Sequence, residues 1–233
     1  MRIFTGAALP DGADTVLVQE EACREASRLH LDGEGPRVRG GNVRAAGLDF
    51  QAGEVLIAPG ERLAPAGIAL AAIAGHAALP VRRRVRIAIA ATGDELRPPG
   101  TPLTPGQLPE SNGTMLIAML AGLPVEITDL GILPDQLDVL TAAFAGIDAD
   151  ILITTGGASV GDHDLVRPAL LAAGAVLDFW KVAVRPGKPM IAGRLGDTVV
   201  LGLPGNPVSA FVTARLFLFP LVAHLSGAAD PSP

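Results

Sequence analysis

The chain has 233 residues, of which 49% are apolar, so it is long enough to bury a sizeable core in one or two domains. Only 3% of its residues are aromatic and none is tyrosine, which predicts a core of Ala, Val, Leu and Ile, as in parallel α/β sheets. The formal net charge of −6 argues against a protein that binds nucleic acid through broad phosphate neutralisation.

Three features of the sequence indicate the compartment. Cys23 is the only cysteine, which excludes an internal disulfide and a cysteine-rich metal site. The first residues, Met1 to Gly6, lack the apolar stretch of a secretory signal. The apolar run from Ile68 to Gly75 is far shorter than the roughly 20 residues that a membrane helix needs. We therefore expect a soluble, cytoplasmic protein without a membrane partner.

The N-terminal third alternates short apolar runs with glycine and charged residues, a pattern typical of small β structure. An Ala-rich helix is predicted from Pro65 to Gly75, because proline suits a first helical turn and glycine a helix end. We assign residues 1–50 to a partial β-rich domain and residues 51–83 to a partial linker or α+β domain. The strands predicted here are Thr15–Gln19, Arg37–Arg39 and Glu54–Ile57.

From Val85 onward strands and helices alternate. The predicted strands are Val85–Ala91, Val125–Leu130 and Ile151–Thr154, and a hairpin is predicted between Gly193 and Leu203. The predicted helices run from Ser111 or Asn112 to Ala121, from Asp135 to Phe144, from Asp164 to Ala173 and from Pro207 to Leu225. Repeated β-α units predict an α/β fold over residues 84–226, with a mainly parallel sheet flanked by helices on both faces and a tail at 227–233.

Polar residues follow each of the three predicted parallel strands. Asp94 and Glu95 follow the first strand, Asp135 the second, and Gly156 with Gly157 the third. Ligands of such sheets bind at the carboxyl ends of the strands, so we expect the three loops to meet there.

The turn after the third strand carries the strongest signal for a ligand. Its glycines and Ser159 can present several backbone N–H groups to a phosphate. Asp162 and Asp164 lie two residues apart beside it, where a hard cation such as Mg²⁺ would bind. The alternative is that Asp135 and Asp164 only cap helices, and that Asp94 only shapes a turn.

Two further segments fit an oxyanion pocket. Arg185-Pro-Gly-Lys-Pro189 places two cations three residues apart on a stiff loop. Asn206 suits a helix N-cap, Pro207 the first helical position, and Ser209 the first turn. Together they predict a small tetrahedral dianion held by Arg185, Lys188 and Ser209. The alternative for the first segment is a turn with two solvated charges.

With these residues in place, the chain resembles the molybdopterin molybdenumtransferase family, which includes the gephyrin E domain. The resemblance covers nearly the whole chain and depends on several motifs in one order. The matching segments are Arg2–Ala7 with Gly12–Asp14, Gly47–Asp49, Thr92–Leu96, Glu110–Asn112, Leu130–Asp135, Gly156–Asp162, Phe179–Lys181, Arg185–Pro189 and Leu203–Ser209.

The resemblance implies transfer of molybdenum from molybdate to adenylylated molybdopterin, with Mg²⁺ and release of AMP, in a homodimer. It implies catalytic roles for Glu95, Asp135, Asp164 and Lys181, and metal binding by Glu95, Asp162 and Asp164. It places phosphate contacts at Gly156, Gly157, Ser159 and Gly161, molybdate contacts at Arg185, Lys188 and Ser209, and pterin-side contacts at Thr5 and Asp49, with Lys181 also facing the pterin side.

The chain also departs from the family pattern. Family members begin before the Thr5 motif with an Asp-Gly-Tyr-Ala segment and continue past Leu225 into a small β domain, so we expect a chain truncated at both ends. Two alternatives to the transferase follow. One is an enzyme like molybdopterin adenylyltransferase, against which the front β region and the Arg185–Pro189 segment argue. The other is a non-catalytic module that binds adenylylated molybdopterin.

Overall fold

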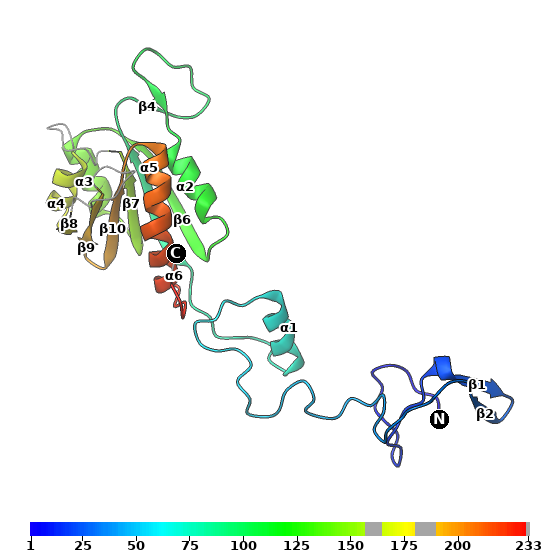
Figure 1. Cartoon of the computed structure of the whole chain (residues 1–233). Helices are drawn as coiled ribbons and strands as arrows, with labels where there is room; N and C mark the ends of the chain where they lie inside the picture. Colours follow the sequence, from blue (N-terminus) through cyan, green and yellow to red (C-terminus); the bar gives the residue numbers. More distant parts are fainter. Residues whose placement is uncertain (157–164, 180–189, 232–233) are drawn as a thin grey trace. The chain divides into compact units, whose positions relative to one another are not determined.

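The computed structural model describes residues 1–156, 165–179 and 190–231. The chain forms two compact units, Met1–Leu56 and Ile57–Pro233 (Figure 1). The finer boundaries expected at residues 50, 83 and 226 stay predictions, because a division into two units does not test them.

The first unit contains small β structure near the N-terminus, as expected, but in a different place. A 3-10 helix, η1 (Gln19–Glu21), leads into a hairpin of β1 (Ala22–Glu25) and β2 (Arg28–Leu31). The turn holds Ala26 at a φ of 53°, a conformation that hairpin sequences usually reserve for Gly or Asn. Because this turn lacks such a residue, the sequence pattern did not indicate the hairpin.

The strands predicted in the N-terminal third are wrong. Residues 15–18, 37–39 and 54–57 form no strand. The Val16 N–H donates to the Gly41 carbonyl at 3.1 Å, and the Asn42 side chain donates to the Val16 carbonyl at 2.9 Å. These two hydrogen bonds satisfy the backbone N–H and carbonyl groups of Val16, so Val16 needs no neighbouring strand. An apolar run in the sequence does not show which partners its backbone groups will find.

The second unit begins with the predicted helix. It is α1 (Pro65–Ile73), with Pro65 in its first turn and Gly75 just beyond its end at a φ of 88°. The chain then enters a six-stranded sheet in the order β6 (Val125–Leu133), β3 (Val85–Thr92), β7 (Ile151–Thr155), β10 (Thr198–Leu203), β9 (Ile191–Leu195) and β8 (Val176–Phe179).

The sheet is mainly parallel, as expected. β3 pairs in parallel with β6 and β7, and β7 pairs in parallel with β10, whereas the β10–β9 and β9–β8 pairs are antiparallel. The predicted hairpin is therefore β9–β10, while β8 was not predicted. A short parallel pair, β4 (Leu96–Arg97) with β5 (Leu108–Pro109), forms a separate projection beyond the sheet (Figure 1).

Helices cover both faces of the sheet, because successive residues of its strands point to opposite sides. Ile87 and Ile89 of β3 pack with α2 (Asn112–Leu120) and with the C-terminal helix. Ala88, between them, packs with α3 (Leu137–Ala145) and α4 (Val166–Ala172) on the other face (Figure 1). The predicted helices are confirmed, although α3 begins two residues after Asp135 and α4 two residues after Asp164.

The C-terminal helix is continuous but changes its winding. It comprises α5 (Pro207–Thr213), a π-helical turn η2 (Ala214–Leu218) and α6 (Phe219–Leu225). Among the described residues, this is the one helix that is long and apolar enough by composition to cross a membrane. Its Ala214, Leu218 and Val222 lie in the buried core beside the sheet, as in the core helix of a globular protein, so the evidence for a membrane span is weak.

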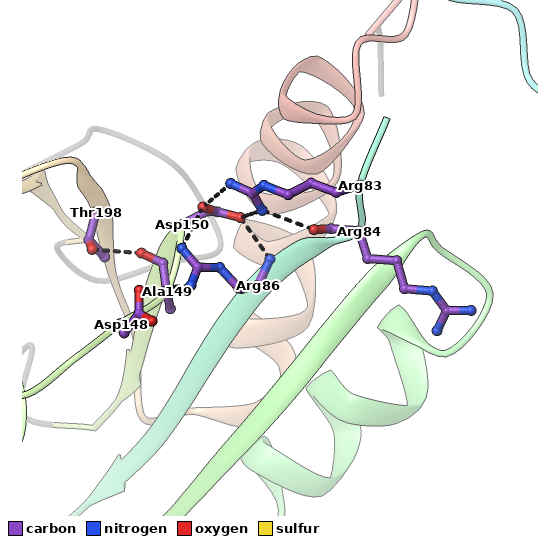
Figure 2. A network of polar contacts seen from close by, with 7 residues as sticks. All are labelled: Arg83, Arg84, Arg86, Asp148, Ala149, Asp150 and Thr198. Carbon is purple, nitrogen blue, oxygen red and sulfur yellow. Dashed lines mark hydrogen bonds and ion pairs between the residues drawn. The ribbon is translucent and has the colours of Figure 1, made fainter. Parts of the chain in front are cut away.

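A network of charged residues closes the amino ends of the central strands (Figure 2). Asp150 accepts two hydrogen bonds from the Arg83 guanidinium, at 2.6 and 2.8 Å, and one from the Arg86 backbone N–H at 2.8 Å. Arg86 also pairs with Asp148, and the Thr198 hydroxyl donates to the Ala149 carbonyl. These bonds hold the starts of β3, β7 and β10 together at the edge opposite the polar loops.

The Arg83 guanidinium holds the pKa of the Asp150 carboxyl well below its usual range. The hydrogen bond from the Arg86 backbone lowers this pKa as well, and these effects outweigh the partial burial that would raise it. Asp150 therefore stays charged in the folded protein. Its contacts stabilise the amino ends of the strands, at the edge of the sheet opposite the candidate site.

Candidate functional site at the carboxyl edge of the sheet

The loops that follow β3, β6, β7 and β10 meet at one edge of the sheet. The Asp135 backbone N–H donates to the Asp94 carboxylate at 3.1 Å, which joins the loops after β6 and β3. The Asn112 side chain, at the start of α2, donates to the Gly205 carbonyl after β10 at 2.9 Å. For the described residues, the expected convergence of the loops is confirmed.

Gly156 joins the loop after β7 to this edge because it has no side chain. A Cβ at Gly156 would lie 2.3 Å from the Thr92 carbonyl oxygen at the end of β3, and its φ is 87°. Both the contact and the conformation require glycine. The remaining predicted residues of this turn, Gly157, Ser159, Gly161, Asp162 and Asp164, lie outside the described residues.

Three carboxylates gather where the loops after β3 and β6 touch. Burial raises the pKa of the Asp135 carboxyl, and the neighbouring charges of Asp94 and Glu95 raise it further, while a hydrogen bond from the Asp94 backbone offsets part of this. Gly93 lies beneath the Glu95 side chain, since a Cβ there would be 2.6 Å from a carboxylate oxygen of Glu95. A positive charge beside these three carboxylates would therefore stabilise the ionised form of Asp135.

This cluster does not by itself form a metal site in the structure. Within residues 1–156, 165–179 and 190–231, no three His, Cys, Asp or Glu side chains are arranged to hold a metal ion. Two of the three predicted ligands, Asp162 and Asp164, fall outside these ranges, so the predicted magnesium site stays a prediction.

The start of α5 has the local structure that the sequence predicted. Asn206 is the N-cap, and its side-chain oxygen accepts the Ser209 N–H at 3.1 Å, with Pro207 in the first turn. Ser209 is buried. The backbone N–H of Ser209 already donates to the Asn206 cap, so Ser209 could offer an oxyanion its side-chain hydroxyl but not its amide. Arg185 and Lys188, the other predicted molybdate contacts, lie outside the described residues.

The predicted pterin-side residues Thr5 and Asp49 lie in the first unit. Asp49 is exposed and pairs with Arg44 at 2.5 Å. Within residues 1–56, all of which are described, no side chain is buried, so turns and polar contacts maintain this unit. Lys181, the third predicted pterin-side residue, falls outside the described residues.

The sequence analysis assigned no role to a buried carboxylate near the edge. Glu110 precedes α2, and its side chain accepts the Gly113 N–H at 2.7 Å. It is 9% exposed and lines a cavity of about 520 Å³ beside β3, α2 and β6. The signal was present, because Glu110 lies within one of the segments that carry the family resemblance, but its burial appears only in the fold.

The comparisons with known proteins agree with this architecture. Residues 88–224, which include the sheet and the carboxyl-edge loops, match the family described as probable molybdopterin binding domain. Residues 1–75 match the family described as MoeA N-terminal region, domains I and II. The chain belongs to the molybdopterin molybdenumtransferase family.

Individual relatives show the extent of the match. The chain is 39% identical over 229 residues to a molybdopterin molybdenumtransferase of Haemophilus influenzae and 38% identical over 226 residues to one of Bacillus subtilis. A crystal structure of a molybdopterin biosynthesis MoeA protein from Pyrococcus horikosii, 31% identical, aligns with 97% of the chain at a TM-score of 0.79. The chain spans 56%, 53% and 56% of these three proteins, respectively.

Proposed function

We propose that this chain carries the catalytic α/β domain of a molybdopterin molybdenumtransferase. In this reaction, molybdenum from molybdate is inserted into adenylylated molybdopterin and AMP is released. The family membership supports the proposal, and the observation that carries it is the meeting of Asp94, Asp135 and Gly156 at one edge of the sheet. In α/β sheets, ligands bind at this edge.

Each residue has a proposed role that follows from its position in a motif. Glu95, Asp162 and Asp164 would bind Mg²⁺, and Glu95, Asp135, Asp164 and Lys181 would take part in catalysis. Phosphate contacts are proposed for Gly156, Gly157, Ser159 and Gly161, molybdate contacts for Arg185, Lys188 and Ser209, and pterin-side contacts for Thr5, Asp49 and Lys181.

The negative charges gathered at Asp94, Glu95 and Asp135 would favour binding of a divalent cation. The raised pKa of Asp135 reflects burial and the nearby charges of Asp94 and Glu95, and a bound cation would relieve both effects. When bound, Mg²⁺ would stabilise the charge that develops as the phosphoanhydride-type linkage to AMP breaks. Gly156 lets the loop after β7 lie against the end of β3, since no side chain fits beside Thr92.

Two alternatives remain as competing proposals. An adenylyltransferase would consume ATP and needs no molybdate, whereas a binding module would hold adenylylated molybdopterin without releasing AMP. The match of residues 1–75 to the MoeA N-terminal region favours the molybdenumtransferase over the adenylyltransferase. A homodimer and a cytoplasmic location are part of the proposal.

Incubation with adenylylated molybdopterin, Mg²⁺ and molybdate tests the function. We expect AMP release that depends on molybdate, and a fall of at least about a hundredfold in a Lys188→Ala variant, because the oxyanion would lose a charged partner. Arg194→Ala is the matched control, since Arg194 is an exposed cation on β9. Binding of the substrate without AMP release would support the binding module, and AMP release that does not respond to molybdate would exclude the proposed reaction.

A further inference from the structure

Asn112 is a buried polar side chain at the carboxyl edge of the sheet that has no role in the proposed reaction. It is the first residue of α2 and only 7% exposed. The helix does not use it as a cap, because Ser111 occupies the N-cap position and the Glu110 carboxylate accepts the Gly113 N–H at 2.7 Å. Asparagine has a low helix propensity, so its presence at this position calls for a reason outside α2.

The Asn112 side chain ties α2 to the loop that follows β10. Its amide nitrogen donates to the Gly205 carbonyl at 2.9 Å. Among the described residues, no other hydrogen bond joins residues 205–208 to an element other than α5. Gly205 in turn lies against the loop after β7, since a Cβ there would be 3.5 Å from the Gly156 Cα. One side chain thus holds the junction where three segments meet.

The side-chain oxygen of Asn112 is buried and has no hydrogen-bond partner among the residues that the structure describes. Gly205 fixes the orientation of the amide, because a carbonyl can accept a hydrogen bond but cannot donate one. Leaving a buried acceptor unpaired typically costs at least as much as one neutral hydrogen bond contributes. The stability of the fold therefore gives little reason for asparagine at this position, and the placement of the Gly205 loop gives a better one.

The loop that Asn112 holds begins the helix that carries Ser209. Asn206 follows Gly205 and caps α5 by accepting the Ser209 N–H. The Thr213 hydroxyl donates to the Ser209 carbonyl at 2.7 Å. These two bonds fix Ser209 within its own helix but not relative to the edge of the sheet. The bond from Asn112 to Gly205 connects the start of α5 to α2, which lies beside it (Figure 1).

We propose that Asn112 is a positioning residue for the oxyanion: by holding the Gly205 carbonyl, it sets the place of the Ser209 hydroxyl at the carboxyl edge. The inference rests on the proposed function, in which Ser209 contacts molybdate. Asn112 itself touches no substrate in this role. A misplacement of about 1 Å can slow an enzyme on the order of a hundredfold, so one hydrogen bond at the start of α5 is enough to matter.

Calorimetric titration of the full chain with molybdate alone tests the inference. Asn112→Leu keeps the approximate size of the side chain, removes the donor to Gly205 and adds no charge. We expect this variant to bind molybdate at least about tenfold more weakly than the wild type. In the AMP-release assay the half-saturating molybdate concentration should rise by the same factor, whereas the rate at saturating molybdate should stay within about threefold, because Ser209 would bind molybdate rather than react.

A double-mutant cycle separates a positioning role from a merely structural one. If Asn112 acts through Ser209, Asn112→Leu should change the molybdate affinity of a Ser209→Ala protein less than about threefold. An effect of full size in that background would overturn the inference, and so would wild-type affinity in Asn112→Leu alone. Ser111→Ala is the matched control at the same helix start. Ser111 is exposed and its side chain makes no capping hydrogen bond, so this variant should bind molybdate as the wild type does.

Amide hydrogen exchange reports the position of α5 without any substrate. In Asn112→Leu the Ser209 and Ala210 amides should exchange at least about tenfold faster, while the amides of β7 keep their wild-type rates. Unchanged exchange at α5 would overturn the inference even where molybdate-dependent AMP release is found. Conversely, absence of AMP release together with molybdate binding that depends on Asn112 would refute the proposed function and leave the inference standing.

Discussion

Replacement of Gly156 by alanine places a methyl group where the fold has no room for one. The new Cβ would lie 2.3 Å from the Thr92 carbonyl oxygen, although real Cβ contacts essentially never fall under 3.0 Å. The ends of β3 and β7 would have to separate by most of an ångström in a buried, hydrogen-bonded region. Forcing a buried contact apart typically costs about 1–3 kcal/mol. The φ of 87° adds about 1–2 kcal/mol for a residue with a Cβ.

We therefore expect Gly156→Ala to lower the free energy of unfolding by about 2–5 kcal/mol, measured by urea denaturation monitored through the circular dichroism of the helices. Gly146→Ala is the matched control, because Gly146 follows α3 with a φ of −87° and its Cβ would make ordinary contacts at 3.6 Å. That variant should stay within about 1 kcal/mol of the wild type. Equal stability of the two variants would refute the close approach of the loop after β7 to β3.

Two further predictions concern the charged groups at the opposite edges of the sheet. Asp150→Asn should destabilise the protein by up to about 1 kcal/mol near pH 7, because the largely exposed Arg83 loses its ion-pair partner. Since folding lowers the pKa of Asp150, this difference should begin to shrink as the pH falls below about 4 and should be lost only as the pH falls through the lowered pKa of the folded protein; a difference that does not shrink in acid would contradict the ion-pair origin. Asp135→Asn should instead stabilise the metal-free protein near pH 7. Folding raises the pKa of Asp135, so its charged form weakens the fold as the pH rises through that pKa, and the advantage of the variant should vanish in acid. Thermal unfolding across pH measures both, and a less stable Asp135→Asn protein would show that the carboxylate has a compensating partner.

The second unit could be predicted in considerable detail because its elements follow local rules. The strand at Val85 consists almost entirely of small apolar residues, and Pro65 and Asn206 begin helices where their backbone preferences allow it. The small β strand β8 (Val176–Phe179) escaped prediction because only its partner β9 makes it a strand. In the first unit the true hairpin turns at Ala26, so no glycine or asparagine indicated it.

The candidate site divides in a similar way. The expectation that Asp94 and Asp135 lie together rested on the rule for parallel strands, and a single hydrogen bond confirms it. The sequence contained Glu110 as well, but nothing local distinguishes a buried glutamate from an exposed one. The grouping of Arg185, Lys188 and Ser209 stays a prediction.

The sequence by itself determined the helices and the central strands of the second unit, the proline and glycine positions that begin or end several helices, and the family to which the chain belongs. These depend on backbone preferences and short-range patterns that each segment carries within itself. Only the tertiary structure decided which groups are buried and which surfaces touch: the contact of Gly156 with Thr92, the ion pairs of Asp150 with two arginines, and the burial of Glu110. Burial and proximity arise from segments far apart along the chain, so no single segment contains them.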